Sequence, residues 1–144
     1  MSTIVKFFVA PDGASAALAL GAGPGRAFEP LSFGNFDADE AVVEWECLIS
    51  GGRFEELLEA GEPRIVAGED DDGCVVFALS GRLVDALAEA EPARLHEVAA
   101  EWARQRAEDG AAIDADVARE MLGSLGVLAR GTKEHGHGLY CWVA

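Results

Sequence analysis

Two histidines and a cysteine near the C-terminus have the residue types and spacing best suited to chemistry. His135 and His137 are separated by one glycine, and Cys141 follows four residues later. Imidazole and thiolate are preferred zinc ligands, and on an extended chain this even spacing puts all three side chains on one face. The sequence supplies no second Cys-x-x-Cys or His-x-x-x-His pair as a source of the fourth ligand. Zinc binding is therefore one hypothesis. The other, which we favour, is a glycine-containing turn with two solvated histidines before a strand.

Tyr140 and Trp142 alternate with Cys141 along the same segment, so on a strand they share the opposite face. An exposed Tyr-Trp pair is a natural anchor for a protein partner or for a second copy of the chain. If helices cover both faces of the sheet, the pair is instead part of the core. The sequence leaves both alternatives open.

Other catalytic and ligand-binding patterns are incomplete. The glycine-rich stretch at residues 21–26 lacks the ending of a P-loop, and the three aspartates at residues 70–72 do not fit the spacing of an EF-hand. No Gly-x-Ser-x-Gly elbow is present. Because no pattern combines a nucleophile, a base and an orienting group, the sequence favours a non-catalytic protein but leaves enzyme activity open. Apart from the possible zinc, no cofactor is indicated.

The charge of the chain limits the classes of partner. Its 26 acidic and 11 basic residues give a net charge of −15 at pH 7. Fifteen acidic and four basic residues fall in the first 72 positions, so the N-terminal half is the more acidic. Nucleic acids and anionic membranes attract basic proteins, so neither is an expected partner. A basic protein surface would be attracted.

Length and cysteine content point to one intracellular domain. The 144 residues suffice for a single globular domain, and half of them are hydrophobic. Three widely separated cysteines give no disulfide framework and are typical of a reducing compartment. No stretch has the pattern of a signal peptide or a membrane span. We therefore expect one cytoplasmic domain covering residues 1–144.

The order of the predicted elements indicates an α+β fold. Residues 3–9 and 139–143 predict strands, and two short β-like runs at residues 65–67 and 74–79 predict a hairpin. Helices are expected to begin after Asp37, Ser80, Pro92 and Asp114, with shorter ones at residues 14–20 and 54–59. We predict a small, mostly antiparallel sheet that includes both terminal strands, packed by about four to five helices.

One short segment resembles other proteins. Residues 34–41 read Gly-Asn-Phe-Asp-Ala-Asp-Glu-Ala, and the segment extends to Trp45. This is similar to a Gly-x-Phe-Asp-x-Asp-x-Ala stretch in small, uncharacterised bacterial proteins. The resemblance covers about a dozen residues. It implies no known activity.

These observations favour a non-catalytic protein–protein interaction or regulatory module, at most one that neutralises or mimics a partner as acidic immunity proteins do. Tyr140 and Trp142 are its candidate contact residues, and homodimerisation through them is an equally simple use. The alternative is a metal-binding protein or metal-dependent enzyme that uses His135, His137 and Cys141.

Overall fold

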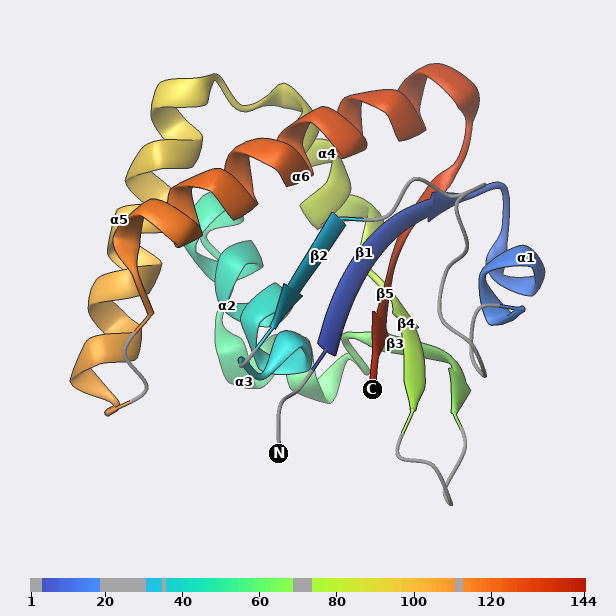
Figure 1. The fold of residues 1–144 in the computed structure, drawn as a ribbon, viewed down its shortest axis with the longest axis horizontal. Helices are drawn as coiled ribbons and strands as arrows, with labels where there is room; N and C mark the ends of the chain where they lie inside the picture. The colour runs from blue at the N-terminus through green and yellow to red at the C-terminus, as the bar shows by residue number, and fades with distance from the viewer. Residues whose placement is uncertain (1–3, 19–30, 35, 69–73, 111–112) are drawn as a thin grey trace.

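Five antiparallel strands form one sheet in the order β2-β1-β5-β4-β3 (Figure 1). The strands are β1 (Ile4–Ala10), β2 (Leu31–Gly34), β3 (Arg64–Gly68), β4 (Val75–Ala78) and β5 (Gly138–Val143). In this computed structural model, the described residues are 4–18, 31–34, 36–68, 74–110 and 113–144. The two terminal strands, β1 and β5, are neighbours, with Phe7 opposite Cys141. This confirms the predicted sheet.

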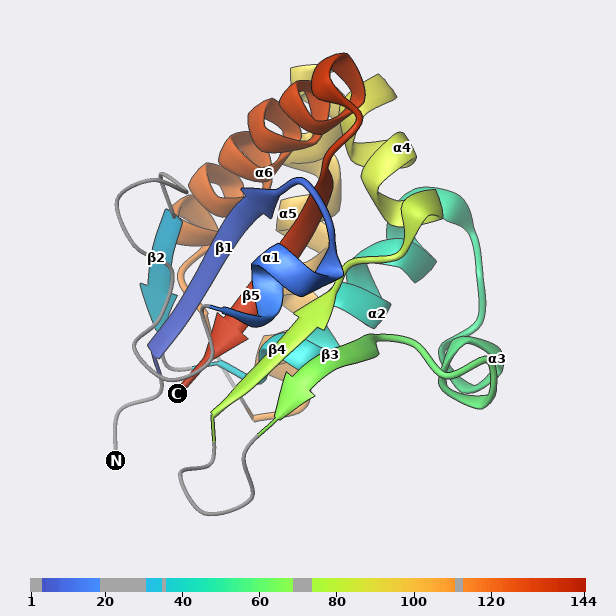
Figure 2. The same ribbon diagram turned by 90° about the vertical axis from the view of Figure 1, so that its right-hand side faces the viewer.

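Six helices complete the described part of this small α+β domain. They are α1 (Gly13–Ala17), α2 (Ala38–Ser50), α3 (Phe54–Glu59), α4 (Gly81–Glu89), α5 (Pro92–Glu108) and α6 (Ala115–His135). The four longer helices lie on one side of the sheet, whereas α1 lies on the other side (Figures 1 and 2). Helix α3 packs on α2 and lies at the outer edge of the molecule (Figure 2).

Most helix boundaries follow from local sequence signals. Ser80 and Asp114 begin α4 and α6 as side-chain caps, accepting hydrogen bonds from backbone N–H groups of the first turn. Gly51 ends α2 in the left-handed region, at a φ of 77°. Asp37 takes the predicted N-cap position of α2 but makes no side-chain cap hydrogen bond there. The boundary was therefore predicted correctly, although the capping interaction was not.

Each face of the sheet has its own hydrophobic core. The larger core lies between the sheet and the long helices and contains Phe7, Trp45, Trp102 and Cys141. The smaller core lies on the other face, where alternate side chains of β1, β4 and β5 pack together with Ala16 of α1. The near-continuous apolar character of β1 reflects this burial on both faces.

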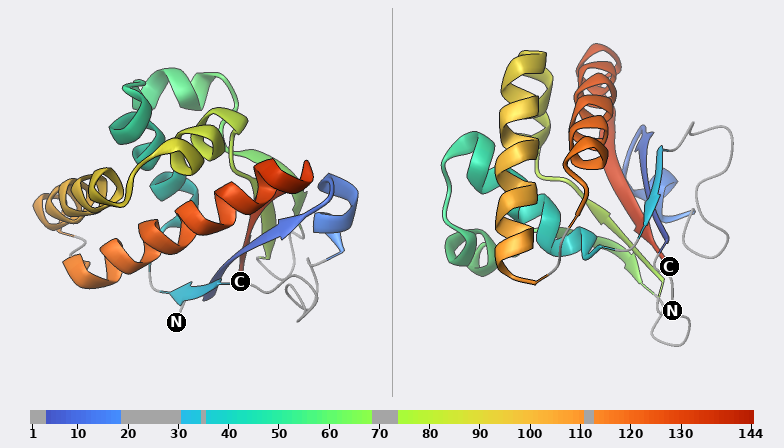
Figure 3. Two further views of the ribbon diagram at one scale, coloured as in Figure 1. Left: turned by 90° about the horizontal axis from the view of Figure 1, so that it is seen from above. Right: turned by 60° about the vertical axis from the view of Figure 1, so that its left-hand side comes forward.

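Helices α5 and α6 lie alongside each other on the same side of the sheet (Figure 3). Gly126 lies at this contact, where an added Cβ would stand only 2.7 Å from Leu95 Cδ1. The sequence pattern predicted only that this glycine weakens α6. The helical spacing of apolar residues after Asp114 predicts that Val117 is buried, but it is 41% exposed, since it lies in the first turn of α6, close to the surface.

Within the described residues, no helix combines the length and apolar character needed to cross a membrane. The glycine-rich stretch at residues 21–26 and the aspartates at residues 70–72 lie outside the described residues.

Candidate functional site

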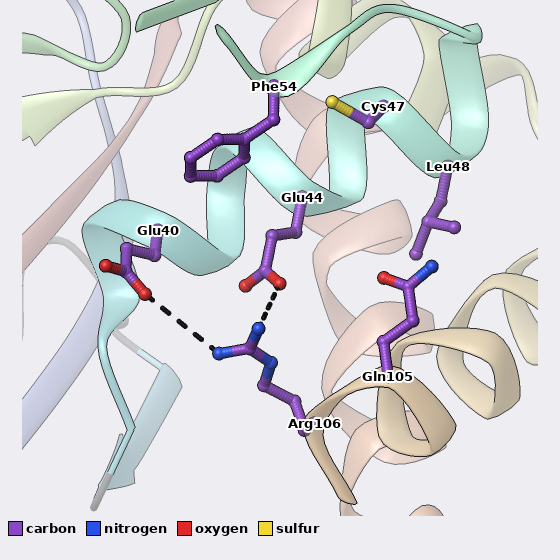
Figure 4. Close-up of a pocket in the computed structure, with 7 residues that line it drawn as sticks. All are labelled: Glu40, Glu44, Cys47, Leu48, Phe54, Gln105 and Arg106. Carbon is purple, nitrogen blue, oxygen red and sulfur yellow. Dashed lines mark ion pairs between the residues drawn. The ribbon is translucent and has the colours of Figure 1, made fainter. Parts of the chain in front are cut away.

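A pocket of about 440 Å³ opens between α2, α3 and α5, on the helical side of the molecule (Figure 4). Its lining residues are Glu40, Glu44, Cys47, Leu48, Phe54, Gln105 and Arg106. A volume in this range is typical of sites for small ligands or for side chains of a partner. We call this concavity the α2–α5 pocket.

Helix α2 supplies one wall of the α2–α5 pocket from a single stripe. Glu40, Glu44, Cys47 and Leu48 are spaced four, three and one residues apart, so they lie along one side of the helix over successive turns. The stripe changes from acidic at the N-terminal end of α2 to apolar toward its C-terminal end. A ligand in the pocket would therefore meet charge at one end and hydrocarbon at the other.

An ion-pair network closes the acidic end. Arg106, from the last turn of α5, lies 2.6 Å from Glu44 and 2.7 Å from Asp109, whereas its distance to Glu40 is 4.0 Å. In Figure 4 both glutamates point toward the guanidinium. Arg106 is 18% exposed and Glu44 11%, whereas Glu40 is 52% exposed. Three carboxylates thus surround one guanidinium. Glu40 and Glu44 line the pocket, and Glu40 is the more exposed of these two.

The surroundings of Glu44 leave its charge incompletely compensated. Burial raises the pKa of the Glu44 carboxyl, although Arg106 and a hydrogen bond from Trp102 oppose the shift. Trp102 Nε1 donates that hydrogen bond to Glu44 Oε1 over 3.5 Å. Additional positive charge near Glu44 would favour its ionised form.

Trp45 of α2 and Trp102 of α5 pack against each other where the two helices meet. The rings of Trp45 and Trp102 meet edge to face with centroids 5.2 Å apart, and Phe36 packs on Trp102 at 5.9 Å. Both tryptophans are completely or almost completely buried. Because bulky rings fill the contact below, we infer that they hold the helices far enough apart for the pocket to form above.

The apolar end is formed by Leu48, Phe54 and Cys47. All three are half-buried, and all pack against the edge of the larger core. Burial and the nearby carboxylates Glu46 and Glu44 raise the pKa of the Cys47 thiol. A thiol is nucleophilic as the thiolate, so this environment makes Cys47 a poor nucleophile. The α2–α5 pocket is better suited to binding than to covalent chemistry.

A second set of carboxylates, Glu46 and Glu62, lies near the junction of α2, α3 and α4. Glu46 is buried, and it accepts a hydrogen bond from the hydroxyl of Ser80, whose oxygen also caps α4. Burial, followed by the negative charge of Glu46, raises the pKa of Glu62. The adjoining cavity is only about 10 Å³, roughly the room for one water molecule. We assign these residues a structural role in the packing of the helices.

The three predicted zinc ligands are not assembled into one site. Helix α6 continues to His135, so this residue and His137 flank a helix end, with Gly136 in the left-handed region. Their rings are 5.7 Å apart and exposed. Cys141 is fully buried in the larger core, and burial holds the pKa of its thiol well above the usual value. The prediction that all three side chains share one face assumed an extended chain from residue 135 to residue 141, and the helix at His135 makes that assumption wrong. No cluster of three or more His, Cys, Asp or Glu side chains suited to a metal occurs in the described ranges.

Tyr140 and Trp142 share one face of β5, as the alternation predicted, but that face is covered. They are 5% and 7% exposed and belong to the smaller core. Phe8 stacks near Tyr140 at 5.9 Å, and Lys6 Nζ lies 5.8 Å from the Trp142 ring centre. Of the two alternatives that the sequence leaves open, the structure has the buried one, and Ala16 of α1 belongs to the same core. Whether the pair takes part in association stays a prediction.

Sequence reasoning missed the residues of the α2–α5 pocket. Taken from the sequence alone, Glu40 fits a helix cap, Cys47 a small core residue and Arg106 one of several scattered cations. The acidic and apolar spacing along α2 was a usable signal. The position of Arg106 beside these residues could not be predicted, because the placement of α5 across α2 depends on tertiary packing.

Comparison with protein-family models, curated proteins and solved structures gives no significant match. The segment that resembles small bacterial proteins covers the end of β2 and the first two turns of α2, with Asn35 outside the described residues. The functional argument therefore rests on the geometry of the α2–α5 pocket.

Proposed function

We propose that this protein is a non-catalytic interaction module that binds a basic protein partner at the surface around the α2–α5 pocket. The observation that carries the proposal is the combination of a concave site with an excess of carboxylates and an apolar end. A net charge of −15 adds long-range attraction for a basic surface, which raises association rates.

The residues lining the α2–α5 pocket support binding over catalysis. Cys47, a possible nucleophile, has a raised pKa, and no histidine lines the pocket to act as its base. Self-association at this surface is disfavoured, because two strongly acidic copies would repel each other. A separate basic partner fits the charge better.

The test compares two charge reversals at exposed glutamates. Glu40→Lys changes the rim of the α2–α5 pocket, and Glu134→Lys makes the same charge change on α6, away from it. Affinity capture from the source cells, followed by cross-linking and mass spectrometry, compares the wild type with both variants. We expect a partner that cross-links to α2, α3 or α5 and is lost only with Glu40→Lys. Equal capture by both variants, or cross-links confined to other surfaces, would contradict the proposal.

A further inference from the structure

We infer that the α2–α5 pocket receives a lysine or arginine side chain of the partner, with its cationic end beside Glu40 and Glu44 and neighbouring hydrocarbon against Leu48 and Phe54. This inference rests on the proposed function and specifies what the pocket recognises. It follows from the order of chemical groups along the pocket.

The cationic end is placed by the state of the two glutamates. Glu40 lies 4.0 Å from Arg106 and is half exposed, so it is available to pair with another cation. Glu44 is engaged by Arg106, yet burial still raises its pKa. A second cation near both carboxylates would offset that burial by favourable electrostatic interaction.

An anionic ligand is the obvious competing occupant, since Arg106 also lines the pocket. However, Glu44 and Asp109 already contact Arg106 Nη2 at 2.6 and 2.7 Å, and Glu40 lies 4.0 Å from Nη1. An incoming carboxylate or phosphate would meet both of these acids and Glu40. The local charge and the charge of the whole chain both favour a cation.

The apolar end is placed by Leu48 and Phe54. The aliphatic stem of a lysine or arginine, together with an adjacent apolar residue, can cover these half-buried side chains. Such a ligand presents a cation and hydrocarbon in the same order as the pocket presents carboxylates and apolar walls. The cation-binding carboxylates and the apolar residues lie at opposite ends of the α2 stripe.

The probe for this inference is a pair of synthetic peptides, N-acetyl-Leu-Lys-Leu-amide and N-acetyl-Leu-Glu-Leu-amide. Each is titrated into isotope-labelled protein while amide and indole N–H signals are followed by NMR. We expect the lysine peptide to shift signals from α2, α3 and the end of α5, including the indole of Trp102. The glutamate peptide should bind at least about five-fold more weakly.

Matched variants locate the interaction. Glu40→Gln and Glu44→Gln should each weaken binding of the lysine peptide by about five-fold, whereas Glu134→Gln on α6 should leave it unchanged. Higher salt should weaken binding to the wild type. Removing a charge without changing side-chain size keeps the folds comparable, and thermal unfolding of each variant checks this.

Two results would overturn the inference: tighter binding of the glutamate peptide, or equal binding of the lysine peptide by all variants. A partner captured through Glu40 by a protein that ignores the lysine peptide would retain the proposed function and reject this inference. Peptide binding in the expected pattern without any captured partner would support the cation site and reject the proposed interaction module.

Discussion

The smaller core on β5 and the α2–α5 pocket both contain side chains suited to recognition, but only the pocket is open. Tyr140 and Trp142 are 5% and 7% exposed and belong to the core that includes Ala16 of α1, whereas Glu40 and Phe54 border a cavity of about 440 Å³. The contrast arises from what lies above each surface. Small residues such as Ala16 let α1 approach the sheet closely, whereas Trp45 and Trp102 fill the contact beneath the pocket. Recognition groups therefore remain accessible where large rings separate two helices.

The largest expected loss of stability comes from a substitution in the smaller core. Trp142→Ala should destabilise the protein by about 3–5 kcal/mol, because it removes a buried ring from the smaller core. Chemical denaturation followed by circular dichroism measures the loss. A variant with wild-type stability and altered oligomeric state would show that Trp142 is exposed in solution and would reverse the contrast.

The next largest loss of stability is expected from the ion-pair network at the α2–α5 pocket. Arg106→Met should cost about 1–3 kcal/mol at neutral pH, because it leaves Glu44 and Asp109 without their shared cation. The loss should shrink in acid, where Glu44 becomes protonated. Denaturation at several pH values measures it.

Arg104→Met is the matched control on the same helix, since Arg104 forms only exposed pairs with Glu101 and Glu108. We expect no measurable change in its stability. Equal losses in the two variants would mean that Arg106 is no more important to α5 than a surface arginine.

A smaller effect tests the closed contact between α5 and α6. Gly126→Ala should destabilise the protein by about 1–2 kcal/mol, because the new Cβ would crowd Leu95 by more than the helix gains from alanine. Gly123→Ala, three residues earlier, meets open space and should be neutral or stabilising. Thermal unfolding of the pair decides this point. Stabilisation by both substitutions would show that the helices can separate to accept a side chain.

The smallest effect concerns Glu44. Its carboxyl has a raised pKa in the folded protein, so the folded state holds that proton more tightly than the unfolded state does. The contribution of Glu44 to stability is therefore greatest in acid and falls as the pH rises from about 4.5 through the raised pKa. At neutral pH, the Glu44→Gln variant should be as stable as the wild type or slightly more stable. The gain in the free energy of unfolding should be less than about 1 kcal/mol. This advantage should disappear in acid. Paired denaturation curves across that range measure it, and a constant difference at every pH would contradict the assigned environment.

Local signals predicted the elements of this fold better than its candidate site. Ser80, Asp114 and Gly51 define helix ends through nearby backbone groups, so the sequence alone identified them. Alternation correctly placed Tyr140 and Trp142 on one face of β5. Their burial could not be predicted, because it depends on tertiary packing on that face, to which Ala16 of α1 contributes from more than 120 residues away in the sequence.

The candidate site depends on long-range packing in the same way. Glu44 and Arg106 come from helices separated by more than forty residues, and neither has an unusual local sequence. His135 and Cys141 show the opposite case. Their spacing suggested a site, but the helix extends through His135 and the strand turns Cys141 into the larger core.

A crystal structure of the protein with N-acetyl-Leu-Lys-Leu-amide would test the central claim most directly. We predict that the lysine ammonium lies within hydrogen-bond distance of Glu40 or Glu44, with a leucine against Leu48 and Phe54. A peptide bound elsewhere, or one whose lysine points into solvent while only its leucines contact the α2–α5 pocket, would contradict the claim that this site recognises a cation.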